Sequence, residues 1–218
     1  SGRFRRDQLL HEWLAKEFGL LYPIVLDGDA QYGLIHRLDQ DTSGAVLSAR
    51  TYKGYYTARL QFAADRVRKE YVCLCWGRVP KEPRSVEAPL LKLSGDRLRT
   101  VVAATGRPSC TEILEVGHMV CPSGRPVSLL RLRLRTGRLH QIRVHMKHIG
   151  HPLVGDLLYG GEMPEWCSRI MLHSLRVCLD LGEGVVPLEA PVPEDMRQAF
   201  AVLVPEGNAK GMLASLGN

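Results

Sequence analysis

The sequence predicts an α+β fold with a mixed, largely antiparallel central sheet and flanking helices. Three observations favour this class. Segments that alternate apolar and polar residues follow one another in runs separated by turns, without strict alternation with helices. The clearest strand, 127–135, places Leu130, Leu132 and Leu134 on one face and arginines on the other. A length of 218 residues suits a single domain spanning 1–218.

Each expected element follows from residue spacing and from start and stop signals. Besides 127–135, the expected strands are 69–77, 98–104, 110–116 and 170–181, and the expected helices are 7–18, 51–66, 138–149 and 194–203. Asp7 can cap the first helix, and Gly150 ends the third. Two short apolar runs, 34–35 and 45–47, predict strands on either side of a polar loop.

The charge distribution favours an anionic partner. The formal net charge is +6, from 29 Lys and Arg against 23 Asp and Glu. One stretch has six basic residues and no acidic one: Arg131, Arg133, Arg135, Arg138, Arg143 and Lys147. A solvated charged face is the plain alternative, and nucleic acid is the sharper interpretation. No apolar run approaches the ~20 residues of a membrane span, so no membrane partner is expected.

The cysteines and histidines indicate neither a disulfide framework nor a metal site. Six cysteines are scattered without a CxxC pair, which favours a reducing compartment inside the cell and leaves cytoplasm, nucleus and organelle open. The histidines at 140, 145, 148 and 151 have no acidic or cysteine partner at ligand spacing. Neither a GxGxxG nor a GxxxxGK[ST] motif is present, so no nucleotide cofactor is indicated.

Two stretches concentrate chemically useful side chains. Residues 33–44, GLIHRLDQDTSG, place the Asp39 carboxylate two residues from Arg37 in a loop between apolar runs. From spacing alone this is also an ordinary Asx turn. Residues 136–145, TGRLHQIRVH, lead from a strand into a helix start with arginines, whose positive end suits a carboxylate or a phosphate. A basic amphipathic surface helix is the alternative.

The residue motifs in these stretches resemble those of the RluA-like pseudouridine synthases. The matching motifs are HRLDxxTSG at 36–44, Lys69-Glu70-Tyr71, and TGRxHQIRxHM with GHPxxGDxxYG at 136–160. The resemblance covers about residues 9–203 and implies the catalytic fold of that family. Its members usually carry a strand ending in Lys-Pro-x-Gly before the first helix; this chain starts after it, so we expect that edge strand to be missing.

The resemblance also implies roles for individual residues. Asp39 is the expected catalytic residue, Arg143 its ion-pair partner, and Tyr71 the residue that stacks on the target base. Arg37 corresponds to the arginine that enters the RNA helix where the base was. Ile142 is expected in the apolar wall of the site, and the remaining substrate-binding candidates of these motifs are His36, Thr42, Arg138 and Gln141.

The implied reaction is the isomerisation of uridine to pseudouridine in ribosomal, transfer or organellar RNA. It involves no redox change, so no cofactor is expected, and we expect a monomer. Asp39 can act as nucleophile or as a base on the sugar, and an arginine partner favours its ionised form. The alternatives are a catalytically silent RNA-binding or RNA-chaperone module, and a glycoside hydrolase using Asp39 and Asp41, which the 6% aromatic content fits poorly.

Overall fold

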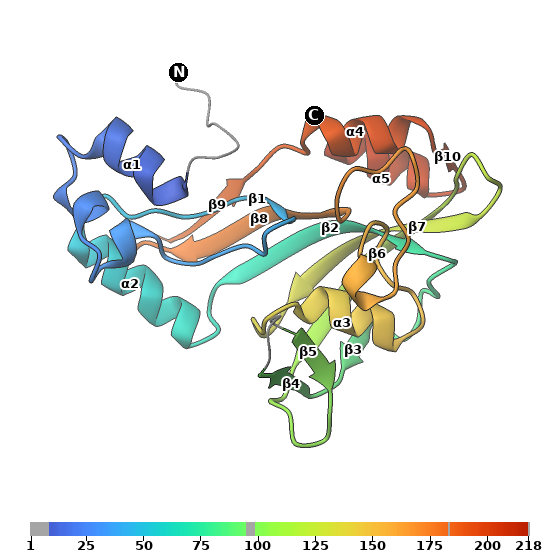
Figure 1. Cartoon of the computed structure of the whole chain (residues 1–218), viewed down its shortest axis with the longest axis horizontal. Coiled ribbons are helices and arrows are strands. Elements are labelled where there is room, and N and C mark those ends of the chain that lie inside the picture. The colour runs from blue at the N-terminus through green and yellow to red at the C-terminus, as the bar shows by residue number, and fades with distance from the viewer. Residues whose placement is uncertain (1–8, 95–98, 183, 218) are drawn as a thin grey trace. The chain divides into compact units, whose positions relative to one another are not determined.

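The computed structural model describes residues 9–94, 99–182 and 184–217 (Figure 1). The chain divides into two compact units, each described by itself below. The first comprises Ser1–Leu38, Val46–Val67 and Cys178–Pro187, and the second comprises Asp39–Ala45, Arg68–Val177 and Leu188–Asn218. The expected cap of the first helix, Asp7, lies outside the described residues. A single domain over 1–218 stays a prediction.

The first unit is mainly helical. It contains α1 (Leu10–Phe18), η1 (Pro23–Leu26), η2 (Gln31–Gly33) and α2 (Tyr52–Ala63). Thr51 caps α2, because its side-chain oxygen accepts a hydrogen bond from the Gly54 N–H at 3.1 Å. Between the helices the chain makes one antiparallel bridge, Leu34 with Ser48. The strand expected at 34–35 is therefore reduced to this bridge.

The second unit is built on a twisted mixed sheet. Its strands are β1 (Ser43–Gly44), β2 (Arg68–Trp76), β3 (Ser85–Glu87), β6 (Cys110–Val120), β7 (Pro126–Leu134) and β10 (Val204–Pro205). The sheet also includes β8 (Leu172–Asp180) and β9 (Val185–Glu189), of which residues 172–177 and 188–189 belong to this unit. The order is β1-β8-β2-β7-β6-β10, with β3 on β6 and β9 on β8. The β2, β7 and β6 pairings are antiparallel, whereas β1 runs parallel to β8. The predicted fold class is confirmed, and the strand expected at 45–47 is wrong because the chain pairs with β8 at 43–44 instead.

Helices cover both faces of this sheet, because alternate residues of β2 and β7 point to opposite sides. On one face, α4 (Glu194–Ala201) and α5 (Ala209–Leu216) pack against a core that includes Val72, Leu74, Val127 and Leu129. On the other face, α3 (Gln141–His148) packs against the core of Cys73, Cys75, Leu130 and Leu132. Figure 1 shows α4 and α5 together on one side and α3 on the other.

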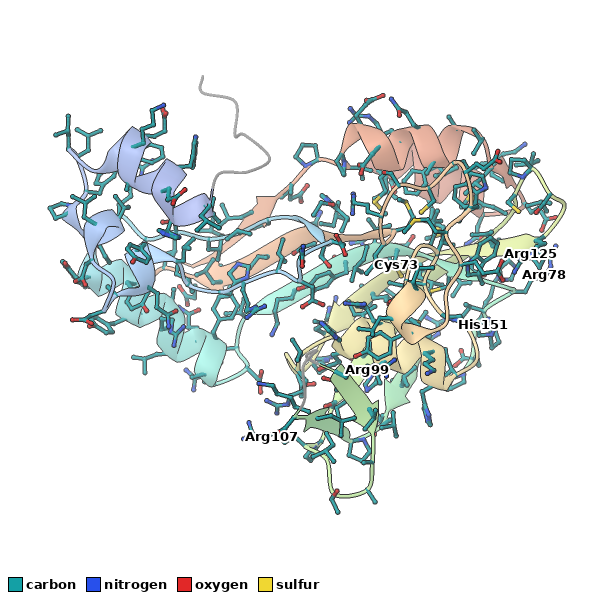
Figure 2. All side chains as sticks on the ribbon, viewed as in Figure 1. Cys73, Arg78, Arg99, Arg107, Arg125 and His151 are labelled. Carbon is teal, nitrogen blue, oxygen red and sulfur yellow. The ribbon has the colours of Figure 1, made fainter. Side chains whose placement is uncertain are left out.

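A second, two-stranded sheet adjoins α3. It pairs β4 (Leu90–Leu93) with β5 (Arg99–Val102) in antiparallel register. Leu90 is buried against Val144 of α3 and Tyr159 of η3 (Leu157–Tyr159). Figure 2 shows Arg99 close to α3, and its Nη2 donates to the Leu158 carbonyl at 3.2 Å. The strand expected at 98–104 is thus found as β5, paired with β4.

The strand arginines face away from the side that carries α3. In the β2–β7 register Tyr71 lies opposite Leu132, and the neighbouring pair Glu70–Arg133 points to the other face. Glu70 is buried there and bonds Arg131 at 2.8 Å and Arg133 at 3.4 Å. These cations are therefore balanced by glutamates within the sheet. The basic stretch does not form one continuous cationic stripe.

The helix α3 does not fit the alternative of a basic amphipathic surface helix. It begins at Gln141 instead of 138, since His140 adopts a left-handed conformation with φ of 54°. All six residues from Gln141 to Met146 are buried. A basic helix with such burial must satisfy its charges with protein partners. In the described ranges, every helix is too short or too polar to cross a bilayer.

Candidate active site

Asp39 begins a short loop, residues 39–44, that β8 holds in place; we call it the Asp39 loop. The Thr42 N–H donates to the Asp39 carbonyl at 3.0 Å, which closes a turn. Gly44 then lies against β8 with φ of 126°, and a Cβ there would overlap the backbone of Ser174. Only glycine fits this approach, which explains the glycine of the Thr-Ser-Gly motif. The Asp39 side chain remains 19% exposed.

Arg143 joins Asp39 to a second, fully buried carboxylate. Its Nε and Nη2 each donate to Asp156 at 2.8 Å, a two-pronged pair. Its Nη1 lies 3.8 Å from Asp39 Oδ2. Burial alone would lower the pKa of Arg143, but the hydrogen bonds with Asp156 and the charge of Asp39 raise it overall. Arg143 is thus a permanent cation whose free edge faces Asp39.

His140 and Tyr159 form a third side of the site. The strained backbone of His140 points its ring at Tyr159, with 2.9 Å between Nδ1 and the phenol oxygen. That oxygen also accepts the Thr100 N–H at 2.9 Å. The other ring nitrogen of His140, Nε2, lies 3.9 Å from Asp39 Oδ2. The imidazole of His140 therefore faces the carboxylate beside Arg143.

Tyr71 lies on the sheet face that packs against α3. It is partly buried beside the core that contains Leu132 and Ile142. Burial raises the pKa of the Tyr71 phenol to about 12, and the nearby charge of Asp39 adds to the increase. Tyr71 therefore stays neutral at physiological pH. The structure brings together Asp39, Arg143 and Tyr71, the three residues expected to be catalytic.

The other residues of the third motif build the frame of the site. Gln141 accepts from Thr136 Oγ1 (2.8 Å) and the Arg138 N–H (3.0 Å), and its amide nitrogen donates to two atoms of β6. All of its polar atoms are engaged, so substrate binding, as expected of Gln141, would require breaking this network. Ile142 is 3% exposed and packs in the core, so its expected contact with substrate has little surface.

Two expected substrate contacts retain unpaired atoms. The Thr42 Oγ1 and the Arg138 Nε are buried and have no hydrogen-bond partner in the structure. Both belong to the unit that contains Asp39. Buried polar atoms normally have a hydrogen-bond partner, so these two atoms are candidates for hydrogen bonds to a ligand.

His36 and Arg37 belong to the first unit. The Nε2 of His36 accepts the Leu47 N–H at 3.2 Å, and its ring stacks on Phe62 with 5.0 Å between centroids. His36 is therefore engaged within the first unit. Arg37 is exposed.

Three site residues were not assigned from the sequence, namely His140, Asp156 and Tyr159. Each lies in the motifs at 136–160, and the GDxxYG spacing was the available signal. The sequence did not indicate Asp156 as the partner of Arg143, because a carboxylate 13 residues later in the chain has no recognisable helical or strand relation to that arginine. Across the described residues no group of three or more His, Cys, Asp or Glu side chains is arranged to hold a metal ion.

Comparison with known proteins identifies the family. The family described as RNA pseudouridylate synthase matches residues 10–148. A protein of Chloroflexus aurantiacus named uncharacterized RNA pseudouridine synthase is 41% identical over 180 residues, covering 81% of this chain and 55% of its own. The ribosomal large subunit pseudouridine synthase D of Yersinia pestis is 39% identical over 197 residues, covering 84% and 58%.

A solved structure also resembles this chain. Human RNA pseudouridylate synthase domain containing 1 superposes with a TM-score of 0.74 at 26% identity, covering 97% of this chain and 86% of that one. The chain belongs to the RNA pseudouridylate synthase family, and its likeness to the RluA-like members is confirmed. It spans between 55% and 58% of the length of the two curated relatives named above.

Proposed function

We propose that this chain is an RNA pseudouridine synthase that isomerises specific uridines through Asp39. The observation that carries the proposal is the position of the Asp39 carboxylate, which has Arg143 Nη1 at 3.8 Å and His140 Nε2 at 3.9 Å. A pure RNA-binding module gains nothing from a carboxylate in a basic site, because it repels phosphate. A reaction at the sugar requires such a group.

The proposed chemistry leaves the composition of the RNA unchanged. Asp39 acts at the ribose, as nucleophile at C1′ or as base on the sugar, and the bond between C1′ and uracil N1 breaks. The detached uracil turns, and C5 forms the new bond to C1′. The proton on C5 is lost and N1 gains one. Arg143 supplies the positive charge that stabilises the carboxylate, and Tyr71 stacks on the uracil while it turns.

The target base must leave the RNA stack, at a cost of a few kcal/mol. We propose that the exposed Arg37 fills the vacated place, and that Tyr71 stacking offsets ~1–3 kcal/mol of that cost. The unpaired Nε of Arg138 and the Oγ1 of Thr42 are the proposed polar contacts to the flipped nucleotide.

The proposed substrate is structured RNA, with large-subunit ribosomal RNA as the first candidate and transfer and organellar RNA as further ones. The name of the Yersinia pestis relative supports this order. We further propose a monomer that needs no cofactor, in a reducing compartment of the cell. All six cysteines are free thiols, five of them buried, which supports the compartment.

Release of tritium from RNA tests the proposal. Transcripts of large-subunit ribosomal RNA and of transfer RNA, labelled at uridine C5, are incubated with the chain and with its Asp39→Ala variant. We expect release by the parent and none by the variant. Asp41→Ala is the matched control, since its exposed carboxylate lies in the same loop and should be dispensable. Salt-sensitive RNA binding without release by the parent would point to the silent RNA-binding module instead.

A further inference from the structure

We propose that Arg169 is a positioning residue that sets the distance between Asp39 and Arg143. This inference rests on the proposed function. Arg169 lies just before β8, and it is not part of the motifs that carry the family resemblance. Its side chain contacts the Asp39 loop, and its main chain contacts the segment that holds Arg143. Arg169 thus contacts both the loop that carries Asp39 and the segment that positions Arg143.

The side chain of Arg169 fastens the Asp39 loop to α4. Its Nη2 donates to Ser43 Oγ at 2.9 Å and its Nη1 donates to the Asp41 carbonyl at 3.2 Å. On the other side its Nε and Nη2 bond the Asp195 carboxylate at 2.6 and 3.2 Å. The guanidinium is 17% exposed and planar, so fixing it on Asp195 fixes the direction in which it meets the loop.

The main chain of Arg169 supports the opposite side of the site. Gly155 has φ of 84°, and a Cβ there would overlap the Arg169 carbonyl. That carbonyl also accepts the Cys167 thiol at 2.9 Å. Gly155 is followed directly by Asp156, the two-pronged partner of Arg143. A displacement of residue 169 would therefore move Asp156 as well as the Asp39 loop.

The contact with Ser43 is itself fixed by a buried histidine. Ser43 Oγ lies 2.9 Å from His173 Nδ1, and His173 Nε2 lies 3.0 Å from the Ala190 carbonyl. A carbonyl can only accept, so Nε2 carries the proton and Nδ1 accepts from the Ser43 hydroxyl. Burial lowers the pKa of His173, in keeping with this neutral form. The Ser43 oxygen is then oriented to accept from Arg169.

From these contacts we expect the loss of the Arg169 side chain to lower turnover and to leave RNA binding nearly unchanged. Arg169 bonds the backbone and Ser43 of the Asp39 loop, so its loss shifts the carboxylate without removing a contact to phosphate. A misplacement of about 1 Å at a reacting group costs on the order of 10²-fold in rate. We therefore expect Arg169→Met to lower kcat about 10²-fold and to leave KM for the RNA within about twofold. Arg169→Lys, which keeps the charge and one direction of bonding, should recover part of kcat.

The experiment compares kcat and KM for tritium release from C5-labelled large-subunit ribosomal RNA transcripts, with thermal unfolding of each variant. Arg197→Met is the matched control, because Arg197 also bonds an α4 carboxylate, Glu194 at 2.6 Å, and a carbonyl, that of Val192. Neither partner touches the Asp39 loop, so this control should keep the parent kcat. Asp195→Asn is the milder probe, expected to lower kcat several-fold with little change in Tm.

The outcomes separate this inference from the proposed function. No release by the parent overturns the proposed function itself. Release by the parent with unchanged kcat in Arg169→Met overturns the positioning role, and so does a loss that appears only in KM. If Arg169→Met does not fold, Arg169→Lys and Asp195→Asn decide, because parent kcat in both overturns the role. A drop in kcat in both, with unchanged Tm, supports it.

Discussion

Arg143 donates two hydrogen bonds to the buried Asp156 and turns its remaining nitrogen toward Asp39, 3.8 Å away. The stronger of its two carboxylate partners is therefore not the expected catalytic residue. Asp156 pairs with the guanidinium through two nitrogens and fixes its plane, so Arg143 approaches the Asp39 carboxylate from a set direction. Second partners of this kind preorganise an active site, because the cost of ordering is met during folding.

Removal of Asp156 should destabilise the protein. In Asp156→Ala the Arg143 charge stays buried without its two-pronged partner, and breaking a buried ion pair costs about 3–5 kcal/mol. The free energy of unfolding from urea titration measures this loss. Glu162→Ala is the control, since Glu162 holds Arg125 with the same two-pronged geometry at the exposed surface. A comparable loss in both variants would contradict the argument from burial.

Substitution of Arg143 by lysine should reduce turnover sharply. A lysine keeps the positive charge but cannot donate to Asp156 from two nitrogens while a third nitrogen faces Asp39 at ion-pair distance. We expect kcat for tritium release to fall on the order of 10²-fold. Arg135→Lys is the control, because Arg135 is exposed just after β7 and bonds Glu112. Equal activity of Arg143→Lys and the parent would show that the three-way geometry is unimportant.

The Tyr71 phenol should make folding stability depend on alkaline pH. Its pKa of about 12 in the folded protein lies above the ordinary value of 10, so folding favours the protonated form. This stability is fully present below pH 10 and is lost as the pH rises from 10 to 12. A shift of two units corresponds to about 2.7 kcal/mol. Urea unfolding at pH 9 and pH 12 should show a smaller loss for Tyr71→Phe than for the parent; equal losses would contradict the burial.

Two substitutions of Tyr71 separate stacking from acid–base chemistry. Tyr71→Phe retains the ring, whereas Tyr71→Ala loses the stacking contact of ~1–3 kcal/mol. We expect the alanine variant to lose more kcat/KM than the phenylalanine variant. Equal and complete loss in both would mean that the phenol oxygen, in addition to the ring, takes part in the reaction.

Alanine at Gly44 should be far more disruptive than alanine at another glycine of positive φ. Gly44 (φ 126°) and Gly124 (φ 79°) both strain an alanine, but only at Gly44 would the new Cβ overlap a neighbouring strand. Backbone strain alone costs about 1–3 kcal/mol. We expect Gly124→Ala to show no more than this and to keep its activity, and Gly44→Ala to lose more stability and all tritium release. Similar melting temperatures for the two would argue against the close contact with Ser174.

Arg37 and Arg133 should contribute differently to RNA binding. Arg37 is exposed, whereas Arg133 is bonded to Glu70 and Glu112. Binding of a ribosomal RNA transcript should weaken with salt for the parent. Arg37→Ala should lower affinity and reduce the dependence on salt concentration, while Arg133→Gln leaves both near the parent values. The reverse result would restore the strand arginines as the RNA-binding surface.

Local sequence patterns were sufficient for most single elements. Alternation predicted the strand at 127–135, found at Pro126–Leu134, and helical spacing predicted 51–66, found at Tyr52–Ala63. Local patterns did not predict the position of a strand where the strand depends on a pairing partner distant in the chain. The Asp39 loop forms its two-residue strand at Ser43–Gly44, because β8, about 130 residues later, offers a parallel edge there. Residues 45–47 make separate backbone hydrogen bonds, from the Ala45 N–H to the Ser174 carbonyl and from the Ile35 N–H to the Leu47 carbonyl, and do not form a strand.

The candidate site divides in the same way. The sequence motifs by themselves singled out the candidate catalytic side chains, since the resemblance of these motifs to the family indicated Asp39, Arg143 and Tyr71. Only the tertiary structure decided that Asp156 is the main partner of Arg143, that His140, paired with Tyr159, faces Asp39, and that Arg131 and Arg133 point to the opposite side of the sheet. The physical reason is that sequence specifies local conformation and residue type, whereas charge pairing and the face of a side chain depend on strand register and on contacts between segments far apart in the chain.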